Sequence, residues 1–257
     1  GSGPSANSSA PIASRRSLAA VPAVTWGMSI RFYHLVRRAQ EFEPWWFKFE
    51  KDGIAFGGTV DRDTAKTGTL FDWMSRLGLP LHTVLELGSH EGSHSLQLAS
   101  HPGVEKVIAI EGRADNFARG QFVKSVFGQS NIEQHHANLE SFDPAEWPAV
   151  DAVFCAGLLY HLPRPWEMIN KIGRIAKYGL FLDTHYAASE EVVMDGRGGY
   201  WFREGEDSLS GLSERSFWLT FKSLTIELMN NGFILRHIID LDTPNGPRVQ
   251  LFAEARK

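Results

Sequence analysis

A short apolar run that ends in two spaced glycines is the strongest chemical signal in the chain. Residues 84–92 read Val-Leu-Glu-Leu-Gly-Ser-His-Glu-Gly, which is the pattern acidic-x-Gly-x-x-x-Gly. Such a run is typical of a buried strand that enters a tight turn, where a glycine lets a ligand lie against the backbone. A helix that starts after the turn presents its N-terminal amides to the same ligand. The stretch therefore predicts a ligand-binding turn at Gly88 and Gly92.

A second carboxylate ends the next apolar run. Residues 106–111 read Lys-Val-Ile-Ala-Ile-Glu, which predicts a strand beside the first with Glu111 at its carboxyl end. A carboxylate has two oxygens, and these suit the two hydroxyl groups of a ribose. The glycine spacing differs from the Gly-x-Gly-x-x-Gly pattern of dinucleotide folds, which argues against an NAD-dependent oxidoreductase.

The glycine turn and Glu111 together resemble the class I S-adenosylmethionine-dependent methyltransferases. The resemblance implies a Rossmann-like fold and S-adenosylmethionine as the cofactor, with Glu86 near its methionine amino group. Members of the family often place an acidic residue near the adenine after the third strand. Asn138 stands there, where its amide oxygen can accept and the Leu139 backbone can donate a hydrogen bond, although Asn138 also suits the start of a helix. The expected cofactor contacts are Glu86, Gly88, Ser89, Gly92, Glu111, Asn138, Leu139 and Ala156.

Two histidines follow the next predicted strands. Residues 159–165 read Leu-Tyr-His-Leu-x-x-Pro, which resembles the wobble-uridine carboxymethyltransferases of tRNA and related methyltransferases. Open α/β sheets bind ligands at the carboxyl ends of their strands, so Tyr160 is expected to line the pocket. His161 is a candidate general base, because an unperturbed histidine pKa of about 6.5 suits proton removal. His185 is the second candidate, and for both histidines a packing role is the alternative.

A long insertion, residues 188–216, precedes the last predicted helix. It carries Tyr200, Trp201 and Arg203 among glycines, and long ordered loops of this kind are often lids or substrate-binding elements. We expect these three side chains to hold a planar or anionic acceptor. The alternative is a loop that folds back on the core.

The segment His90-Glu91-Gly92-Ser93-His94 also matches the H-E-x-x-H pattern of zinc proteases. That pattern binds zinc only when both histidines lie on one face of an established helix. Here the first histidine falls in the turn after Gly88, so no metal site is expected.

The rest of the chain alternates apolar runs with helical patterns, which predicts an α/β fold with a mostly parallel seven-stranded sheet. The last two runs, joined at residues 243–247, predict a C-terminal antiparallel hairpin. Strands are expected at residues 83–88, 106–111, 132–137, 150–156, 179–183, 233–240 and 248–255. Helices are expected at residues 28–42, 63–77, up to 99, 114–127, 166–176 and 216–230.

The sequence predicts three parts of the chain. Residues 1–27 are rich in serine, alanine and proline and predict a flexible leader, with a transit or signal segment as the alternative. Residues 28–80 predict a helical and aromatic cap that includes Trp45-Trp46-Phe47. Residues 81–257 predict the methyltransferase domain, interrupted by the lid-like insertion 188–216.

The composition argues against nucleic-acid binding and against a membrane span. The net charge of −4 gives no electrostatic reason to expect a tightly held nucleic acid. No run of about 18 apolar residues predicts a membrane span, and we expect a cytoplasmic protein. The first hypothesis is methyl transfer to an oxygen or nitrogen of a small molecule, such as a sugar or a specialised metabolite. The alternatives are a tRNA wobble-uridine (carboxy)methyltransferase and a cofactor-binding scaffold without turnover.

Overall fold

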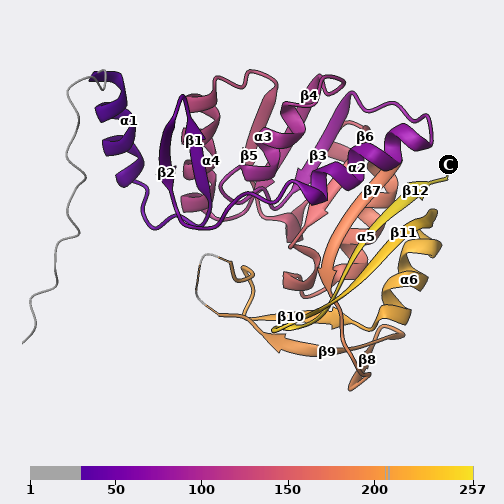
Figure 1. Ribbon diagram of the computed structural model, residues 1–257. Helices are drawn as coiled ribbons and strands as arrows, with labels where there is room; N and C mark the ends of the chain where they lie inside the picture. The colour runs from indigo at the N-terminus through magenta and orange to yellow at the C-terminus, as the bar shows by residue number, and fades with distance from the viewer. Residues whose placement is uncertain (1–29, 206, 208, 257) are drawn as a thin grey trace, which may run out of the picture.

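The computed structural model describes residues 30–205, 207 and 209–256 (Figure 1). The expected leader, residues 1–27, lies outside them. The main sheet has seven strands in the order β11-β12-β7-β6-β3-β4-β5, and β3 to β7 run parallel to one another. Their bounds are β3 (Thr83–Leu87), β4 (Lys106–Glu111), β5 (Ile132–His136), β6 (Val150–Ala156) and β7 (Ala176–His185). The Rossmann-like methyltransferase fold predicted from the sequence is confirmed.

The C-terminal strands close the sheet as a hairpin. β11 (Phe233–Thr243) and β12 (Gly246–Ala255) pair antiparallel, and β12 continues antiparallel onto β7. None of the helices in the described part of the chain has the length and apolar character that crossing a bilayer requires.

Alternate residues of the strands face two separate cores. On one face Val84 packs with residues of α2 (Ala65–Arg76), α3 (Ser93–Ala99) and α4 (Ala114–Phe127). On the other face Leu85 packs with residues of α5 (Pro165–Ile175) and α6 (Phe221–Asn230). Because helices cover both faces, the parallel strands are buried almost throughout, as their continuous apolar runs predict.

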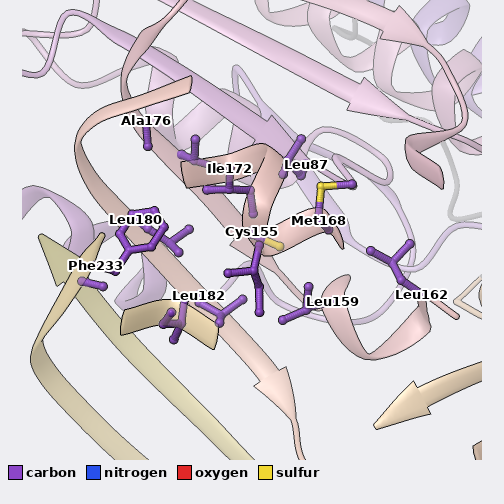
Figure 2. Packing of buried hydrophobic residues seen from close by; sticks show 14 of the residues in the cluster. Leu87, Cys155, Leu159, Leu162, Met168, Ile172, Ala176, Leu180, Leu182 and Phe233 are labelled. Carbon is purple, nitrogen blue, oxygen red and sulfur yellow. The ribbon is translucent and has the colours of Figure 1, made fainter. Parts of the chain in front are cut away.

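Cys155 lies in the middle of the second core. Figure 2 shows its sulfur among Leu87, Leu159, Leu182 and Met168. The side chain is fully buried, and burial raises the pKa of the thiol to about 12. The thiol is therefore a protonated, unreactive packing group, as expected from the apolar run around it.

The N-terminal cap contains an element that the sequence did not reveal. Between α1 (Ile30–Gln40) and α2 the chain forms a hairpin of β1 (Lys48–Lys51) and β2 (Ile54–Gly57). Its Phe49 and Phe56 rings stack with centroids 5.6 Å apart, and Phe56 meets Phe122 of α4 edge-on at 5.9 Å. The aromatic cluster thus attaches the cap to α4, one of the helices that cover the sheet.

The insertion is a small antiparallel sheet rather than a loop. It consists of β8 (Val192–Met194), β9 (Arg197–Arg203) and β10 (Arg215–Leu219) in the order β10-β9-β8, and Figure 1 shows it beside the ends of β7, β11 and β12. The helix expected from residue 216 is wrong over its first turn, because residues 215–219 pair with β9. The helix begins only after Thr220, whose hydroxyl accepts a hydrogen bond from the Ser223 amide at 3.2 Å.

Candidate active site

The glycine turn between β3 and α3 has the backbone shape that its residues predict. Gly88 and Gly92 have φ values of 75° and 81°, a region that side chains with a Cβ rarely adopt. The Gly88 amide donates to the carbonyl of Ile110 at 2.9 Å, which fixes the turn to β4. A Cβ on Gly88 would lie 3.2 Å from the Leu158 side chain. The turn therefore requires glycine at this position.

A cavity of about 310 Å³ opens beside this turn, at the carboxyl ends of the parallel strands. Its position is the one at which open α/β sheets bind ligands. Six of the expected cofactor residues line it, namely Gly88, Ser89, Glu111, Asn138, Leu139 and Ala156. Tyr160 and His161, expected from the loop after β6, line it as well. Glu86 and Gly92 do not.

Glu111 has the geometry needed to hold a diol. The side chain is buried, and its two oxygens each accept a backbone amide, from His90 at 2.7 Å and from Arg113 at 2.8 Å. Burial raises the pKa of Glu111, and these amides oppose that shift. Each carboxylate oxygen has a further lone pair, so the residue fits the two hydroxyls of the cofactor ribose.

Glu86 lies beneath the turn rather than on the cavity wall. Its side chain is 1% exposed, and one oxygen accepts a hydrogen bond from the Ser95 hydroxyl. Its other oxygen, Oε1, has no hydrogen-bond partner among the described residues. Burial raises the pKa of Glu86 to about 8. The carboxyl is therefore predominantly protonated at neutral pH in the protein without cofactor.

Asn138 adopts the alternative foreseen for it, the start of a helix. Its amide oxygen accepts the Glu140 amide at 2.9 Å and so caps the short helix Leu139–Ser141. The side chain still lines the cavity, but the oxygen expected to meet the adenine is already bonded to the backbone.

His161 is held by a carboxylate that the sequence did not reveal. Its Nδ1 lies 2.9 Å from Oε2 of Glu204, which follows β9 in the insertion. Glu204 also accepts the Ser216 hydroxyl at 2.5 Å and the Gly211 amide at 2.7 Å. Burial alone would raise the pKa of Glu204, but these hydrogen bonds hold it below its ordinary value. The carboxylate is therefore ionised, and with Nδ1 engaged the proton-accepting nitrogen of His161 is Nε2.

A second charged cluster borders the same cavity. Asp183, at the end of β7 and 0% exposed, accepts hydrogen bonds from Nε and Nη2 of Arg248 at 2.6 and 2.8 Å. Lys66 Nζ lies 2.6 Å from the same carboxylate. The guanidinium of Arg248 also lies 5.4 Å from the ring centroid of Tyr160. Lys66 and Arg248 line the cavity, and neither was foreseen as a site residue.

The structure does not bring His185, the second candidate base, to this cavity. Its Nδ1 lies 3.1 Å from the carbonyl of Pro247 and its Nε2 lies 3.1 Å from Nη1 of Arg248. Its ring stacks on Trp218 with centroids 4.9 Å apart. Burial, together with the nearby guanidinium, lowers its pKa. Both ring nitrogens are bonded, which is the arrangement expected of the packing role given as its alternative.

The three side chains expected from the insertion also lie elsewhere. Tyr200 packs on Trp218 with ring centroids 5.4 Å apart, and Trp201 packs on Phe217 at 5.2 Å. Arg203 is exposed, and none of the three lines the cavity. They face away because the insertion folds into a sheet, whose strands direct these side chains onto its own faces.

A different part of the insertion reaches the cavity. Residues 209–212 line it, and the side chain of Arg113 donates to the carbonyl oxygens of Ser210 and Gly211 at 2.9 and 3.0 Å. Ser213 donates to the Glu140 carboxylate at 2.7 Å. Residues 209–213 are called the covering loop below. The covering loop thus contacts the segments that follow β4 and β5, in addition to Glu204.

The H-E-x-x-H pattern does not form a zinc helix. His90 has a φ of 50° and lies in the turn, whereas His94 lies in α3. Glu91 accepts the amides of Trp46 and Phe47 at 2.7 and 2.9 Å, so it holds the cap against the turn. Across the described ranges, no three His, Cys, Asp or Glu side chains are placed to share a metal ion.

The chain is similar in sequence and in fold to known proteins. Residues 85–182 match the family model described as a methyltransferase domain. The N-terminal domain of EvdMO1, solved in the presence of S-adenosylhomocysteine and D-fucose, is 33% identical with a TM-score of 0.76 over 87% of this chain and 97% of that domain. Full-length EvdMO1 is 30% identical with a TM-score of 0.65, and the match covers 87% of this chain and 47% of that protein.

A more distant structure shares the fold alone. Magnesium protoporphyrin IX methyltransferase from Synechocystis PCC 6803, solved with bound S-adenosylmethionine, is 19% identical with a TM-score of 0.53, over 75% of this chain and 79% of that one. No curated protein sequence matches the chain. The resemblance to the tRNA wobble-uridine group receives no support from these comparisons. The chain belongs to the S-adenosylmethionine-dependent methyltransferases of class I.

Proposed function

We propose that this methyltransferase acts on a hydroxyl group of a sugar-like small molecule and uses His161 as its general base. The observation that carries the proposal is the hydrogen bond between His161 Nδ1 and the buried Glu204 carboxylate at the wall of the cavity. The D-fucose present with the N-terminal domain of EvdMO1 supports a sugar as the acceptor class.

The presence of a base favours oxygen over nitrogen as the acceptor atom. A neutral amine attacks with its free lone pair, whereas a hydroxyl becomes a good nucleophile only as it loses its proton. When bound, S-adenosylmethionine supplies an electrophilic methyl group on a sulfonium. His161 Nε2 takes the hydroxyl proton as the oxygen–carbon bond forms and the carbon–sulfur bond breaks. Glu204 holds the ring in place and stabilises the imidazolium that results.

We further propose that the cap and the insertion enclose this reaction. Trp46 and Phe47 of the cap and residues 209–212 of the insertion line the same cavity. Apolar walls on two sides exclude water and keep acceptor and cofactor aligned, which supplies much of the rate in group transfer. The lid role expected of the insertion thus falls to its covering loop.

The test is methyl transfer to a panel of free sugars that includes D-fucose, followed by mass spectrometry. We expect a monomethylated product from the wild type. We also expect a loss of kcat of about a hundredfold or more in His161→Ala, with unchanged binding of S-adenosylhomocysteine by calorimetry. Full turnover in the variant would remove the base from the mechanism.

The same experiment separates the alternatives. Cofactor binding without product from any sugar would favour the scaffold without turnover. Product from tRNA transcripts alone, with binding that falls steeply as salt increases, would favour RNA modification. No contact in the described part of the structure favours either alternative over the sugar hydroxyl.

A further inference from the structure

The Asp183 cluster holds more positive than negative charge. Arg248 and Lys66 both bind the single carboxylate of Asp183, so one positive charge has no partner within the cluster. The side chains of Lys66 and Arg248 are 19% and 18% exposed. An unbalanced charge costs free energy in so enclosed a place, which suggests that a ligand completes the site.

The neighbouring acidic groups do not supply the missing charge. Burial raises the pKa of Glu86 to about 8, which leaves it mostly neutral at pH 7. Asp63, which lies near His94, is exposed to solvent. Glu204 is already committed to His161, Ser216 and Gly211.

The cluster lies on the side of the cavity that carries Tyr160 and His161. The guanidinium of Arg248 sits over the Tyr160 ring at 5.4 Å. That ring in turn lies beside the ring of His161, with centroids 4.1 Å apart. An anion bound at the cluster is therefore one side chain away from the base, whereas the ribose-binding Glu111 belongs to the strand beyond β3.

We propose that Lys66 and Arg248, bridged by Asp183, form a carboxylate-binding subsite for the acceptor, so that the enzyme prefers an acidic sugar to a neutral one. This inference rests on the proposed function, because it assumes that the acceptor occupies the cavity beside His161. Lysine and arginine side chains that point into a partly dry cavity bind carboxylates through charge-assisted hydrogen bonds.

The test compares two sugars that differ in one group. D-Galacturonate and D-fucose share the same ring stereochemistry, and a carboxylate on the first replaces a methyl group on the second. Their dissociation constants are measured by NMR titration of the protein saturated with S-adenosylhomocysteine. We expect the wild type to bind D-galacturonate about tenfold or more tightly than D-fucose.

Lys66→Met removes the positive charge that has no partner within the cluster. Arg248 still binds Asp183 through two hydrogen bonds in this variant, so the buried carboxylate remains paired and the fold is expected to persist. The preference for D-galacturonate should disappear. Lys222→Met, which removes an exposed lysine of α6, changes the net charge equally and should keep the preference.

Three results would overturn the proposal. The first is equal affinity of the wild type for the two sugars, and the second is a preference that survives in Lys66→Met. The third is a tenfold or greater loss of S-adenosylhomocysteine affinity in Lys66→Met, about the size of one lost charged hydrogen bond, which would assign the cation to the carboxylate of the cofactor. Failure of the proposed function looks different, because it would abolish methyl transfer to every sugar while leaving the two dissociation constants measurable.

Discussion

Glu204 accepts hydrogen bonds from three segments of the chain, through His161, Ser216 and the Gly211 amide. Only the first of these involves the proposed base, and the other two favour the ionised carboxylate and fix its position. A histidine with one nitrogen on such a carboxylate has a defined tautomer and a stabilised cation. His185, which is bonded through both nitrogens, shows the contrasting case in the same protein.

Replacing this carboxylate by its amide tests the positioning role. In Glu204→Gln the shape is retained but the negative charge that stabilises the imidazolium is lost, so kcat should fall by about a hundredfold. KM and S-adenosylhomocysteine affinity should stay the same, because the side chain does not contact the cofactor in this scheme. Glu214→Gln, an exposed carboxylate of the same insertion, is the control. A purely structural Glu204 would instead change KM, affinity and thermal stability together.

At the scale of the elements, the covering loop contacts both Arg113 and Glu204, the hydrogen-bond partner of His161. Arg113 holds the loop through the carbonyls of Ser210 and Gly211, and the Gly211 amide is itself bonded to Glu204. When the loop lies over the cavity, Glu204 therefore has its full set of partners. The loop therefore connects Arg113, which follows β4, to the carboxylate that holds His161.

Arg113→Ala should weaken both the retention of the cofactor and the support that the covering loop gives to Glu204. Loss of the three hydrogen bonds from this side chain should speed the release of S-adenosylhomocysteine by about tenfold or more and lower kcat in parallel. Stopped-flow measurement of release and steady-state turnover check the two effects. Arg203→Ala, which removes an exposed arginine of β9, should change neither rate. Unchanged release in Arg113→Ala would show that the loop does not retain the cofactor.

The sequence was most informative where a signal is local. The bounds of β4, β6 and α4 agree with the predicted ones, because continuous apolar runs and helical periodicity are properties of neighbouring residues. Residues 216–219 form a strand where the sequence predicts helix, because a short apolar run fits both the helical and the strand periodicity until its strand partner is known. The β1–β2 hairpin was missed for the same reason, as an aromatic run does not identify its partner.

The residues of the site also differ in whether a local sequence pattern marks them. Local sequence patterns mark Gly88, Glu111 and His161. Each of them ends or follows a single strand. Arg248 lines the cavity from β12, and Glu204, which follows β9, holds His161 from behind the cavity wall. The hydrogen-bond partners of both residues lie far away in the sequence. No local pattern marks such residues, because their position depends on how distant strands pair.

At the scale of the whole molecule, two segments from opposite ends of the chain enclose one edge of the sheet. The cap is tied to the glycine turn by the two amides on Glu91, and the insertion is tied to β4 by Arg113. The carboxyls beneath and beside the turn are consequently shielded from water, and burial raises the pKa values of Glu86, Glu91 and Glu111.

This shielding should make the protein without cofactor less stable as the pH rises. The pKa of Glu86 is about 8 in the folded state, whereas a glutamate in the unfolded chain has its ordinary pKa of 4.5. The folded state therefore binds more protons between these values, and stability falls across that window. Glu86→Gln should reduce the fall in thermal midpoint, and the exposed Glu146→Gln should not. An equal pH dependence in wild type and Glu86→Gln would contradict a raised pKa.

The single cysteine is a natural probe of how often the core of the domain opens. Because Cys155 is fully buried at the centre of a core (Figure 2), a maleimide can reach its sulfur only when that core separates. The rate of labelling under native conditions therefore reports how often the domain opens. Each variant above carries this probe without added mutations, so a change in catalysis can be told apart from a change in opening frequency on the same sample.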